Sequence, residues 1–385
     1  MLNYKPSKDF QEFCASFKNS YDDLGWPNPR LESWKLTNVN KFISDTSKLL
    51  TNDRCITFSH KNKEIIKNLN VKSLNLLKSD FFKNHEMSRV ILSNINNGFE
   101  ISLPDNFNSK ENIEIKSKIK LGSWNSSVFI IKIGKNVSAK LSFDFSLSSN
   151  SICTPLIAFE IGENSNISFG FNVVNESDNL NNSNYIALMN GKLMKNSTLN
   201  SLVTQQGVNL SRSEININLV GDYSSFNLVG LYFGRQKHHK DITTSVNHLA
   251  EHTSSKQIVR GILDDSAVGV YQGGIKVSNE AQKTDGKQMS RALLLSKLAE
   301  SNSKPELEIF ADDVSCSHGA TIGELNKDQL FYLLSRGLPF LEARQILIRA
   351  YLNEILEEIY DEDLIKQLNT AINMWLKQLQ FKDAA

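Results

Sequence analysis

The sequence predicts a mainly β protein with helical ends, in which a β-solenoid core lies between an N-terminal helical region and a C-terminal helical domain. Residues 1–88 contain apolar residues at helical spacing, residues 89–325 consist largely of short strand-like runs, and residues 326–385 are strongly helical. Alternating apolar and polar residues are typical of a strand with one buried face, whereas apolar residues three and four apart indicate a helix. We therefore expect three domains with these boundaries.

The N-terminal region begins with one clear helical pattern. Phe10, Phe13, Cys14 and Phe17 would form a single apolar face. The stretch GWPNP at 25–29 must end this helix, because proline restricts its own backbone and that of the preceding residue. Residues 65–82 are mixed and support no firm assignment.

The central region contains strand-like runs separated by polar corners. The runs lie at 90–92, 99–103, 128–133, 139–145, 157–161 and 167–174, and the alternation of apolar and polar residues is clearest in ININL at 215–219. Similar corners at 134–136, 162–164, 195–197 and 221–224 recur roughly every 28–32 residues, which is within the range of stacked repeats. The corner at 264–266 does not follow this spacing. A coiled solenoid therefore fits better than a β-sandwich, which stays open as the alternative.

The C-terminal region predicts three helices. Asn326 is a suitable N-cap, Gly337 a stop signal and Pro339 the start of the next helix. Leu341, Ile348, Leu352, Ile355 and Ile359 then form a narrow apolar stripe. A third helix carries Leu364, Leu368, Ile372, Trp375 and Leu379 on one face. The stripe fits either a partner helix or packing within the chain, and the pattern alone does not decide between them.

Composition excludes several classes of protein. Lys plus Arg is 43 and Asp plus Glu is 42, so the net charge is +1, which argues against a nucleic-acid binder. The N-terminus has no apolar secretory segment, and no run is long enough for a membrane helix. The cysteines Cys14, Cys55, Cys153 and Cys316 are scattered, which argues against a four-thiolate zinc site. We expect a cytoplasmic protein with reduced thiols.

Common catalytic motifs are missing from the sequence. It contains no phosphate-binding P-loop, no nucleophile elbow of the GxSxG type and no HExxH motif. His238 and His239 could form a metal-binding pair, but a solvated turn is the favoured interpretation. Asp312 and Asp313 could bind a hard cation, and an exposed corner is the favoured interpretation there.

The segment ADDVSCSHGAT at 311–321 is the one stretch rich in reactive side chains. Cys316 and His318 are two residues apart, so on a strand they face the same side. A thiolate and an imidazole together suit a borderline or soft metal such as the iron of a cluster. Two ligands are too few for a closed site, so the remainder would come from elsewhere in the chain or from a partner. The competing interpretation is a small buried cysteine beside a surface histidine.

Six blocks follow one another in the last third of the chain: GGIKV (273–277), AQKTD (281–285), RALLLS (291–296), KPELEI (304–309), ADDVSCSHGATIG (311–323) and LFYLLSRG (330–337). Their order and spacing resemble the SufB/SufD family of iron–sulfur cluster assembly proteins, and the CSHGAT run is most similar to the SufD branch. RLESWK (30–35) resembles an N-terminal block of the same family. The resemblance implies a right-handed parallel β-helix between helical regions. Residues 36–225 add little to it beyond a compatible pattern.

The resemblance also implies a function and its partners. The chain would be a non-catalytic subunit of a scaffold complex, pairing with a SufB-like homologue and binding the ABC-type ATPase SufC through its helical domain. His318 and Cys316 would be ligands of iron or of a nascent cluster at the SufB interface, with no cofactor stably bound by the chain alone. The candidate residues for the SufC-facing surface or the core of the helical domain are Leu330, Phe331, Arg336, Leu341, Ile348, Leu352 and Ile355.

Several alternatives stay open from the sequence. The chain could take the SufB role itself, form a homodimer, or be a structural solenoid with an inert Cys-x-His pair. A more distant alternative is a β-helix enzyme acting on carbohydrate. Binding of a flavin, the sulfur donor and the acceptor of the finished cluster are all left open.

Overall fold

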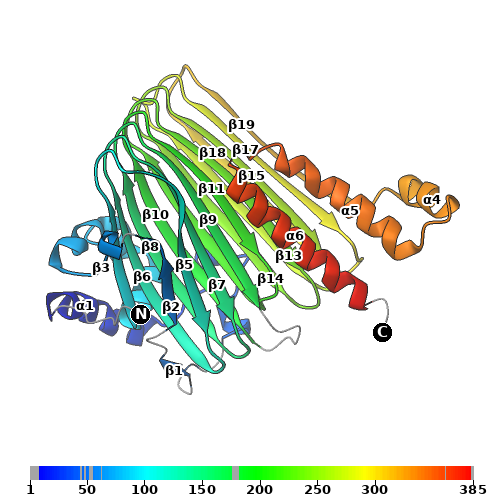
Figure 1. The fold of residues 1–385 in the computed structure, drawn as a ribbon, viewed down its shortest axis with the longest axis horizontal. Coiled ribbons are helices and arrows are strands. Elements are labelled where there is room, and N and C mark those ends of the chain that lie inside the picture. Colours follow the sequence, from blue (N-terminus) through cyan, green and yellow to red (C-terminus); the bar gives the residue numbers. More distant parts are fainter. Residues whose placement is uncertain are drawn as a thin grey trace.

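The computed structural model describes residues 8–43, 46, 49–51, 55–61, 63–175, 182–359 and 361–382, and it shows a two-sheet solenoid covered by helices on both sides (Figure 1). The α-helices are α1 (Lys8–Leu24), α2 (Asp80–Asn84), α3 (Glu86–Ser93), α4 (Lys327–Ser335), α5 (Phe340–Leu356) and α6 (Glu362–Lys382). The strands before the regular coils are β1 (Leu50–Thr51), β2 (Ile56–Ser59), β3 (Ile66–Asn68) and β4 (Asn97–Leu103). Short 3-10 helices lie at Glu32–Trp34, Val39–Lys41, Lys63–Ile65 and Val71–Leu76.

Regular coils follow, and each coil contributes one strand to each of two sheets. The first sheet, called sheet A here, continues from β4 through β6 (Ser123–Ile133), β8 (Ile152–Ile161), β10 (Asn184–Leu193), β12 (Leu210–Leu219), β14 (His239–His248), β16 (Val268–Val277) and β18 (Glu300–Ile309). The second, sheet B, runs from β5 (Asn108–Ile119) through β7 (Ser138–Leu147), β9 (Asn166–Asn175), β11 (Thr198–Gln205), β13 (Ser225–Gly234), β15 (Ser254–Leu263), β17 (Asp285–Leu294) and β19 (Ser315–Glu324).

Pairing within each sheet is parallel from β4 and β5 onward, as the solenoid prediction requires. Only β2 and β3, at the N-terminal end, pair antiparallel with the first coils. Successive strands along the chain belong to different sheets and therefore form no sandwich of hairpins. The predicted β-solenoid is confirmed.

The predicted corners form one edge of the solenoid. Asn106, Asn136, Asn164 and Asn196 all have positive φ, between 55° and 62°, a conformation that asparagine tolerates better than most residues. Their side-chain amides bond from coil to coil, Asn136 to Asn106 (3.0 Å), Asn164 to Asn136 (3.3 Å) and Asn196 to Asn164 (3.0 Å). The corner at 264–266 did not fit the spacing because it lies on the opposite edge, between β15 and β16.

The interior of the solenoid changes character along its axis. One in-register row of inward-facing side chains begins Ile113, Leu141, Phe169 and ends Gln257, Gln288, His318. The aromatic rings of Phe129, Phe143, Phe169 and Phe171 pack together in the early coils. The early coils are therefore held by apolar burial, whereas the last coils contain buried amides and hydroxyls.

The N-terminal region covers the outer face of sheet A. Buried side chains of α1 and α3 pack with outward-facing residues of β6, β8 and β10. The expected α1 face is confirmed, because Phe10, Cys14 and Phe17 are buried and Gly25 (φ 62°) follows the helix. The strand expected at 90–92 is wrong: those residues lie in α3. All three are fully buried, and a helix buried all round has the same continuous apolar run as a buried strand.

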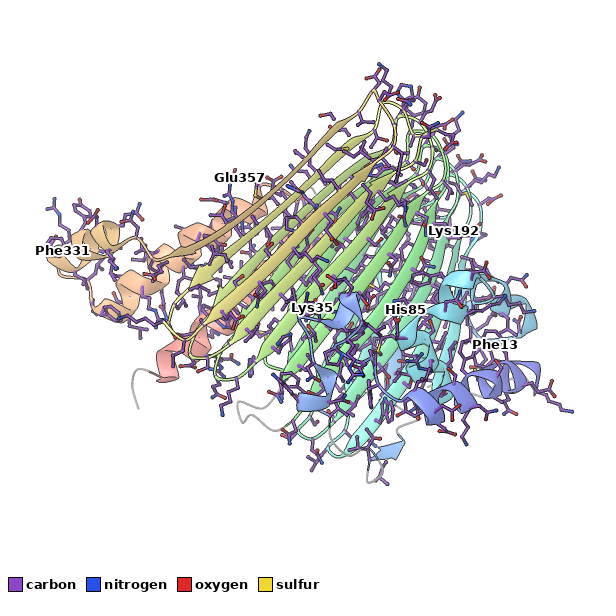
Figure 2. All side chains as sticks on the ribbon, turned by 180° about the vertical axis from the view of Figure 1, so that it is seen from behind. Phe13, Lys35, His85, Lys192, Phe331 and Glu357 are labelled. Carbon is purple, nitrogen blue, oxygen red and sulfur yellow. The ribbon has the colours of Figure 1, made fainter. Side chains whose placement is uncertain are left out.

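The C-terminal helices cover the outer face of sheet B. Figure 1 shows α5 and α6 lying over this sheet and running roughly along its strands, and Figure 2, from behind, shows the N-terminal region on the other face. Asn326 caps α4 as expected, its Oδ1 accepting from the backbone N–H of Asp328 (2.9 Å) and Gln329 (3.0 Å). None of the helices in the described part of the chain is both long enough and apolar enough to span a membrane.

Candidate functional site at the open end of the solenoid

The solenoid ends on two strands, β18 and β19, that have no further strand beyond them among the described residues. Because no coil follows, side chains that face the interior are uncovered here. Ile309 on β18 is 42% exposed and Ile322 on β19 is 50% exposed, although both stand in rows that are buried one strand earlier. The described part of the chain therefore leaves an apolar and polar core open to solvent at this end.

Cys316 and His318 lie in this open end. They pair in register with Gly286 and Gln288 of β17, which are buried and face the interior, so both side chains point inward as the two-residue spacing predicts. Along a strand, two residues separate their Cα atoms by about 7 Å. One metal-bound group placed above the mouth could therefore contact both side chains.

The Cys316 thiol is half-buried and sits over a glycine. A Cβ at Gly286 would lie 3.3 Å from Cys316 Sγ, so the glycine makes room for the sulfur. Burial raises the pKa of this thiol, the negative charge of Asp285 raises it further, and a hydrogen bond from the Gly286 backbone opposes both. In the isolated chain Cys316 is therefore a protonated thiol at neutral pH, and a metal that bound it would displace the proton.

His318 is exposed and stands beside a well-held amide. The Tyr271 hydroxyl donates to Gln288 Oε1 (3.2 Å), and Gln288 Nε2 donates to the Glu306 carbonyl of β18 (3.2 Å). One strand further in, both polar atoms of the fully buried Gln257 side chain have no hydrogen-bond partner among the described residues. These amides were not recognised from the sequence, because nothing in the pattern shows that the interior becomes polar in the last coils.

The described residues do not form a complete metal site by themselves. They contain no cluster of three or more histidine, cysteine, aspartate or glutamate side chains that could hold a metal ion. Two side chains do not close a site for iron, which prefers four ligands in clusters. Cys316 and His318 can thus provide half of a site, and the remaining ligands would come from another molecule.

The other candidate histidines and acids have different environments. His238 and His239 are both buried, so the solvated turn favoured from the sequence is wrong. The Thr37 hydroxyl lies 2.9 Å from His239 Nε2, a contact between distant parts of the chain that the sequence could not show. Burial lowers the pKa of each, which leaves them neutral. Asp312 and Asp313 are exposed at a corner, as favoured, and Asp313 pairs with Lys283.

The candidate partner-binding residues divide into two groups. Ile348, Leu352 and Ile355 are fully buried against outward-facing residues of sheet B, so the stripe packs within the chain. Leu330 and Leu341 are half-buried. Phe331 is 72% exposed and Arg336, whose guanidinium lies 5.2 Å from the Tyr332 ring, is also exposed. Figure 2 shows Phe331 on α4, which projects from the body of the molecule.

A cavity of about 660 Å³ lies beside the open end, and no sequence pattern predicted it. Its walls come from β15, β17 and β19 and from the end of α5, and they include Arg260, Arg291, His318 and Glu354. Arg260 Nη2 pairs with Glu354 (2.8 Å), as does Arg291 Nη1 (3.3 Å). These ion pairs join the C-terminal helices to the strands next to the site.

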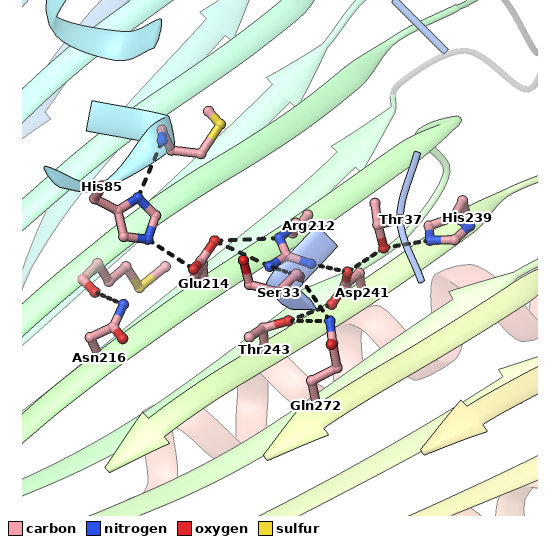
Figure 3. Close-up of polar contacts among 12 residues, drawn as sticks. Ser33, Thr37, His85, Arg212, Glu214, Asn216, His239, Asp241, Thr243 and Gln272 are labelled. Carbon is pink, nitrogen blue, oxygen red and sulfur yellow. Dashed lines mark hydrogen bonds and ion pairs between the residues drawn. The ribbon is translucent and has the colours of Figure 1, made fainter. Parts of the chain in front are cut away.

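A buried ionic network on the outer face of sheet A was also missed (Figure 3). Arg212 is fully buried, pairs with Asp241 and Glu214, and donates from Nη2 to the Ser33 carbonyl (2.9 Å). Its guanidinium lies 4.0 Å from the centre of the Trp34 ring. Burial by itself would raise the pKa of Glu214, but the positive charges of Arg212 and of His85 outweigh it and lower this pKa to about 2. The network holds the RLESWK segment against the solenoid.

Comparison with known proteins identifies the class to which this fold and open end belong. Residues 119–351, more than half of the chain, match the family described as SUF system FeS cluster assembly, SufBD core domain. The chain therefore belongs to the SufBD family. The match contains the solenoid from β6 to β19 together with α4 and most of α5.

Individual relatives point to the SufD branch. The chain is 38% identical over 165 residues to the iron–sulfur cluster assembly protein SufD of Escherichia coli, covering 43% of this chain and 39% of that protein. It is 33% identical over 165 residues to SufD of Bacillus subtilis, covering 43% and 38%. A SufBD family protein of Synechocystis is 45% identical over 126 residues, covering 33% and 27%. The matched stretches span less than half the length of each of these relatives.

Proposed function

We propose that this chain is a SufD-type subunit of a cytoplasmic iron–sulfur cluster assembly complex, in which it pairs with a SufB-type homologue and binds a SufC-type ATPase. Family membership supports a role in cluster assembly, and it replaces the hypothesis of a carbohydrate-active enzyme. The observation that carries the proposal is the open end of the solenoid, where two metal-ligating side chains lie beside unpaired strand edges. ATP hydrolysis is assigned to the partner.

The open end fits a homologous solenoid as its partner. Edge strands expose unpaired backbone groups, which a second sheet can extend by further hydrogen bonds. Burying Ile309 and Ile322 under a partner would remove exposed apolar surface from water. A partner in this position would also supply the ligands that Cys316 and His318 lack. Iron and sulfide are the cargo of such a site, bound while a cluster is built.

The exposed face of α4 supports the second interaction. No residue of α4 is buried, and it presents Phe331, Tyr332 and Leu334 to solvent, with Phe340 following at the start of α5. Single exposed apolar side chains are common on protein surfaces, whereas several of them in one short segment are typical of an interaction site. We assign it to the ATPase. The buried residues Ile348, Leu352 and Ile355 then belong to the core that holds this surface in place.

The role of the ligand pair is tested by anaerobic reconstitution with SufB-type and SufC-type partners. His318→Ala and Cys316→Ser should assemble the complex but lower its iron and sulfide content. His252→Ala is the control, because His252 is an exposed histidine that stacks on Tyr223 at a corner of the solenoid. Wild-type iron and sulfide content in both site variants would reject the proposed chemical role.

The ATPase contact is tested by a matched pair of charge insertions. Phe331→Glu should abolish capture of a SufC-type ATPase, whereas Leu50→Glu should leave it unchanged. The two positions are equally exposed, at 72% and 73%, and lie at opposite ends of the chain. Equal capture by both variants would move the contact away from α4. Light scattering of the chain alone and with a SufB-type protein separates a heterodimer from a homodimer.

A further inference from the structure

Helix α3 begins with an uncommon cap residue. The usual N-cap residues are serine, threonine, aspartate and asparagine, whose side-chain oxygen accepts from a backbone N–H of the first turn. In α3 the N-cap is His85, and its ring nitrogen Nδ1 accepts from the backbone N–H of Met87 (3.2 Å). Histidine is the side chain whose charge ordinarily changes between about pH 5 and pH 8. A proton can therefore reach this cap under conditions in which the usual cap residues do not titrate.

The other ring nitrogen of His85 is bound at the same time. His85 Nε2 lies 2.9 Å from Glu214 Oε1, and the two side chains are 11% and 8% exposed (Figure 3). Because the pKa of Glu214 is lowered to about 2, its carboxylate is ionised and can only accept, so Nε2 carries a hydrogen. Nδ1 carries none, because it accepts from Met87. The two contacts together define a neutral imidazole with its hydrogen on Nε2.

A second proton on His85 would have to bind to Nδ1. The new N–H would point at the N–H of Met87, donor against donor, and the cap would be lost. The bond from Nε2 to Glu214 would be kept and would become charge-assisted on both sides, so the ring would stay in place. The first turn of α3 is therefore the part that gives way. The partial positive charge of a helix N-terminus also repels an imidazolium.

Charged groups of both signs surround His85. On β12, Glu214 favours an imidazolium, whereas Arg212, which pairs with Glu214 (3.2 Å), opposes it. The charged residues of α2 and of the first turns of α3 are two acids and two bases, Asp80, Lys83, Glu86 and Arg89. These charges influence how readily the imidazole takes up a proton. The consequence of that proton for the cap follows from the geometry at Nδ1.

We infer that His85 is a proton-controlled cap of α3, which holds the first turn of the helix only while the imidazole is neutral. Met87, Val90 and Ile91 of α3 are fully buried and pack with α1 and with the outer face of sheet A. Opening the first turn loosens the N-terminal covering at the point where Glu214 joins it to the Arg212 network. Acid therefore weakens this covering, at a place separate from the open end of the solenoid.

Hydrogen exchange of the full chain, resolved to single amides, tests the cap directly. The protection of the Met87 amide, relative to its intrinsic exchange rate, should fall roughly fivefold between about pH 8 and pH 5, as expected when one helix N-cap is lost. Amides of α6 should keep their protection over the same range. ¹⁵N NMR of the chain labelled at histidine should show His85 with its hydrogen on Nε2 at pH 8.

Two substitutions of His85 provide matched controls. His85→Asn keeps a capping oxygen that does not titrate, so protection of the Met87 amide should stay high at both pH values. His85→Ala has no cap, and protection should be low at both. Thermal melting of each variant confirms that it is folded. The inference is overturned by full protection of Met87 in wild type at pH 5, by a fall that His85→Asn or the α6 amides share in full, or by a hydrogen on Nδ1 at pH 8.

Discussion

Two parts of the chain cover the solenoid, the N-terminal region on sheet A and the C-terminal helices on sheet B. Both coverings are attached by ion pairs, but these pairs differ in how deeply they are buried. On sheet A the N-terminal segment is held by Arg212, Asp241 and Glu214, all buried. On sheet B, α5 and the residues that follow it are held by pairs of mixed exposure. Arg291–Glu354 and Lys256–Glu358 have side chains between 30% and 58% exposed, whereas Arg260 and the Arg344–Asp264 pair are largely buried. Buried charges cost much when one partner is lost, whereas exposed pairs contribute little. The N-terminal attachment therefore depends on buried charges throughout, whereas the C-terminal attachment also contains exposed pairs that can be lost at little cost.

The difference fits the roles proposed for the two faces. The N-terminal segment contacts β12, β14, β16 and β18 through Arg212, Asp241, Gln272 and Lys304, and so braces the last coils. The C-terminal helices carry the exposed α4 surface and border the cavity beside His318. A contact that changes during a working cycle must have alternatives of similar free energy. Exposed ion pairs on the C-terminal side meet that requirement.

The largest expected effect is on the buried network. Arg212→Met leaves Asp241 and Glu214 buried without their cation and should lower the free energy of unfolding by about 3–5 kcal/mol. Urea unfolding measures the loss, and limited proteolysis should show early cleavage before residue 96. A change below about 1 kcal/mol would mean that the network does not hold the N-terminal covering.

Lys240 tests the cost of a buried charge separately from ion pairing, because it has no carboxylate partner among the described residues. Its side chain points into the solenoid and donates from Nζ to the Val208 carbonyl (2.6 Å). Burial lowers the pKa of Lys240 from 10.5 to about 7. Between these values the unfolded chain holds a proton that the folded chain has released, so the stability of wild type rises with pH across this window.

Lys240→Met removes this dependence. The variant should exceed wild type in unfolding free energy most at pH 7 and below, where the folded wild type bears the full cost of a buried ammonium. The excess should shrink steadily toward pH 10.5. Chemical denaturation at several pH values measures the difference. A constant difference between the two proteins across that range would show that Lys240 does not titrate as its burial implies.

The smallest expected effect is on the exposed pairs. Glu358→Gln removes the partner of Lys256 and should cost less than about 1 kcal/mol, with a smaller cost in high salt because exposed charges are screened. Hydrogen exchange of α5 and α6 at low and high salt detects any loosening of this end. A loss as large as that of Arg212→Met would erase the distinction between the two coverings.

The sequence predicted the solenoid and both helical ends because their signals are local. Corner asparagines, alternating strands and the Asn326 cap each depend on a few neighbouring residues. The buried helix at α3 was mistaken for a strand because burial on all sides removes periodicity. Arg212 and Ser33 meet across 179 positions, and no local pattern encodes such a contact.

The candidate site, too, was predictable only in part. The shared inward direction of Cys316 and His318 followed from their spacing on a strand, and the structure confirms it. The position of this strand at an open end, with Gln288 and Tyr271 beneath it, depends on how the coils stack. The environment predicted for His239 was wrong for the same reason, since Thr37, which contacts it, comes from the N-terminal part of the chain.

We propose that this chain contributes His318 as a ligand to a cluster that its partner completes. Label histidine with ¹⁵N in this chain only, reconstitute the complex with unlabelled partners, reduce the cluster and record its hyperfine spectrum. We predict a coupling to one labelled nitrogen, lost in His318→Ala and kept in His252→Ala. A cluster that forms in full without any coupling to labelled nitrogen would contradict the account.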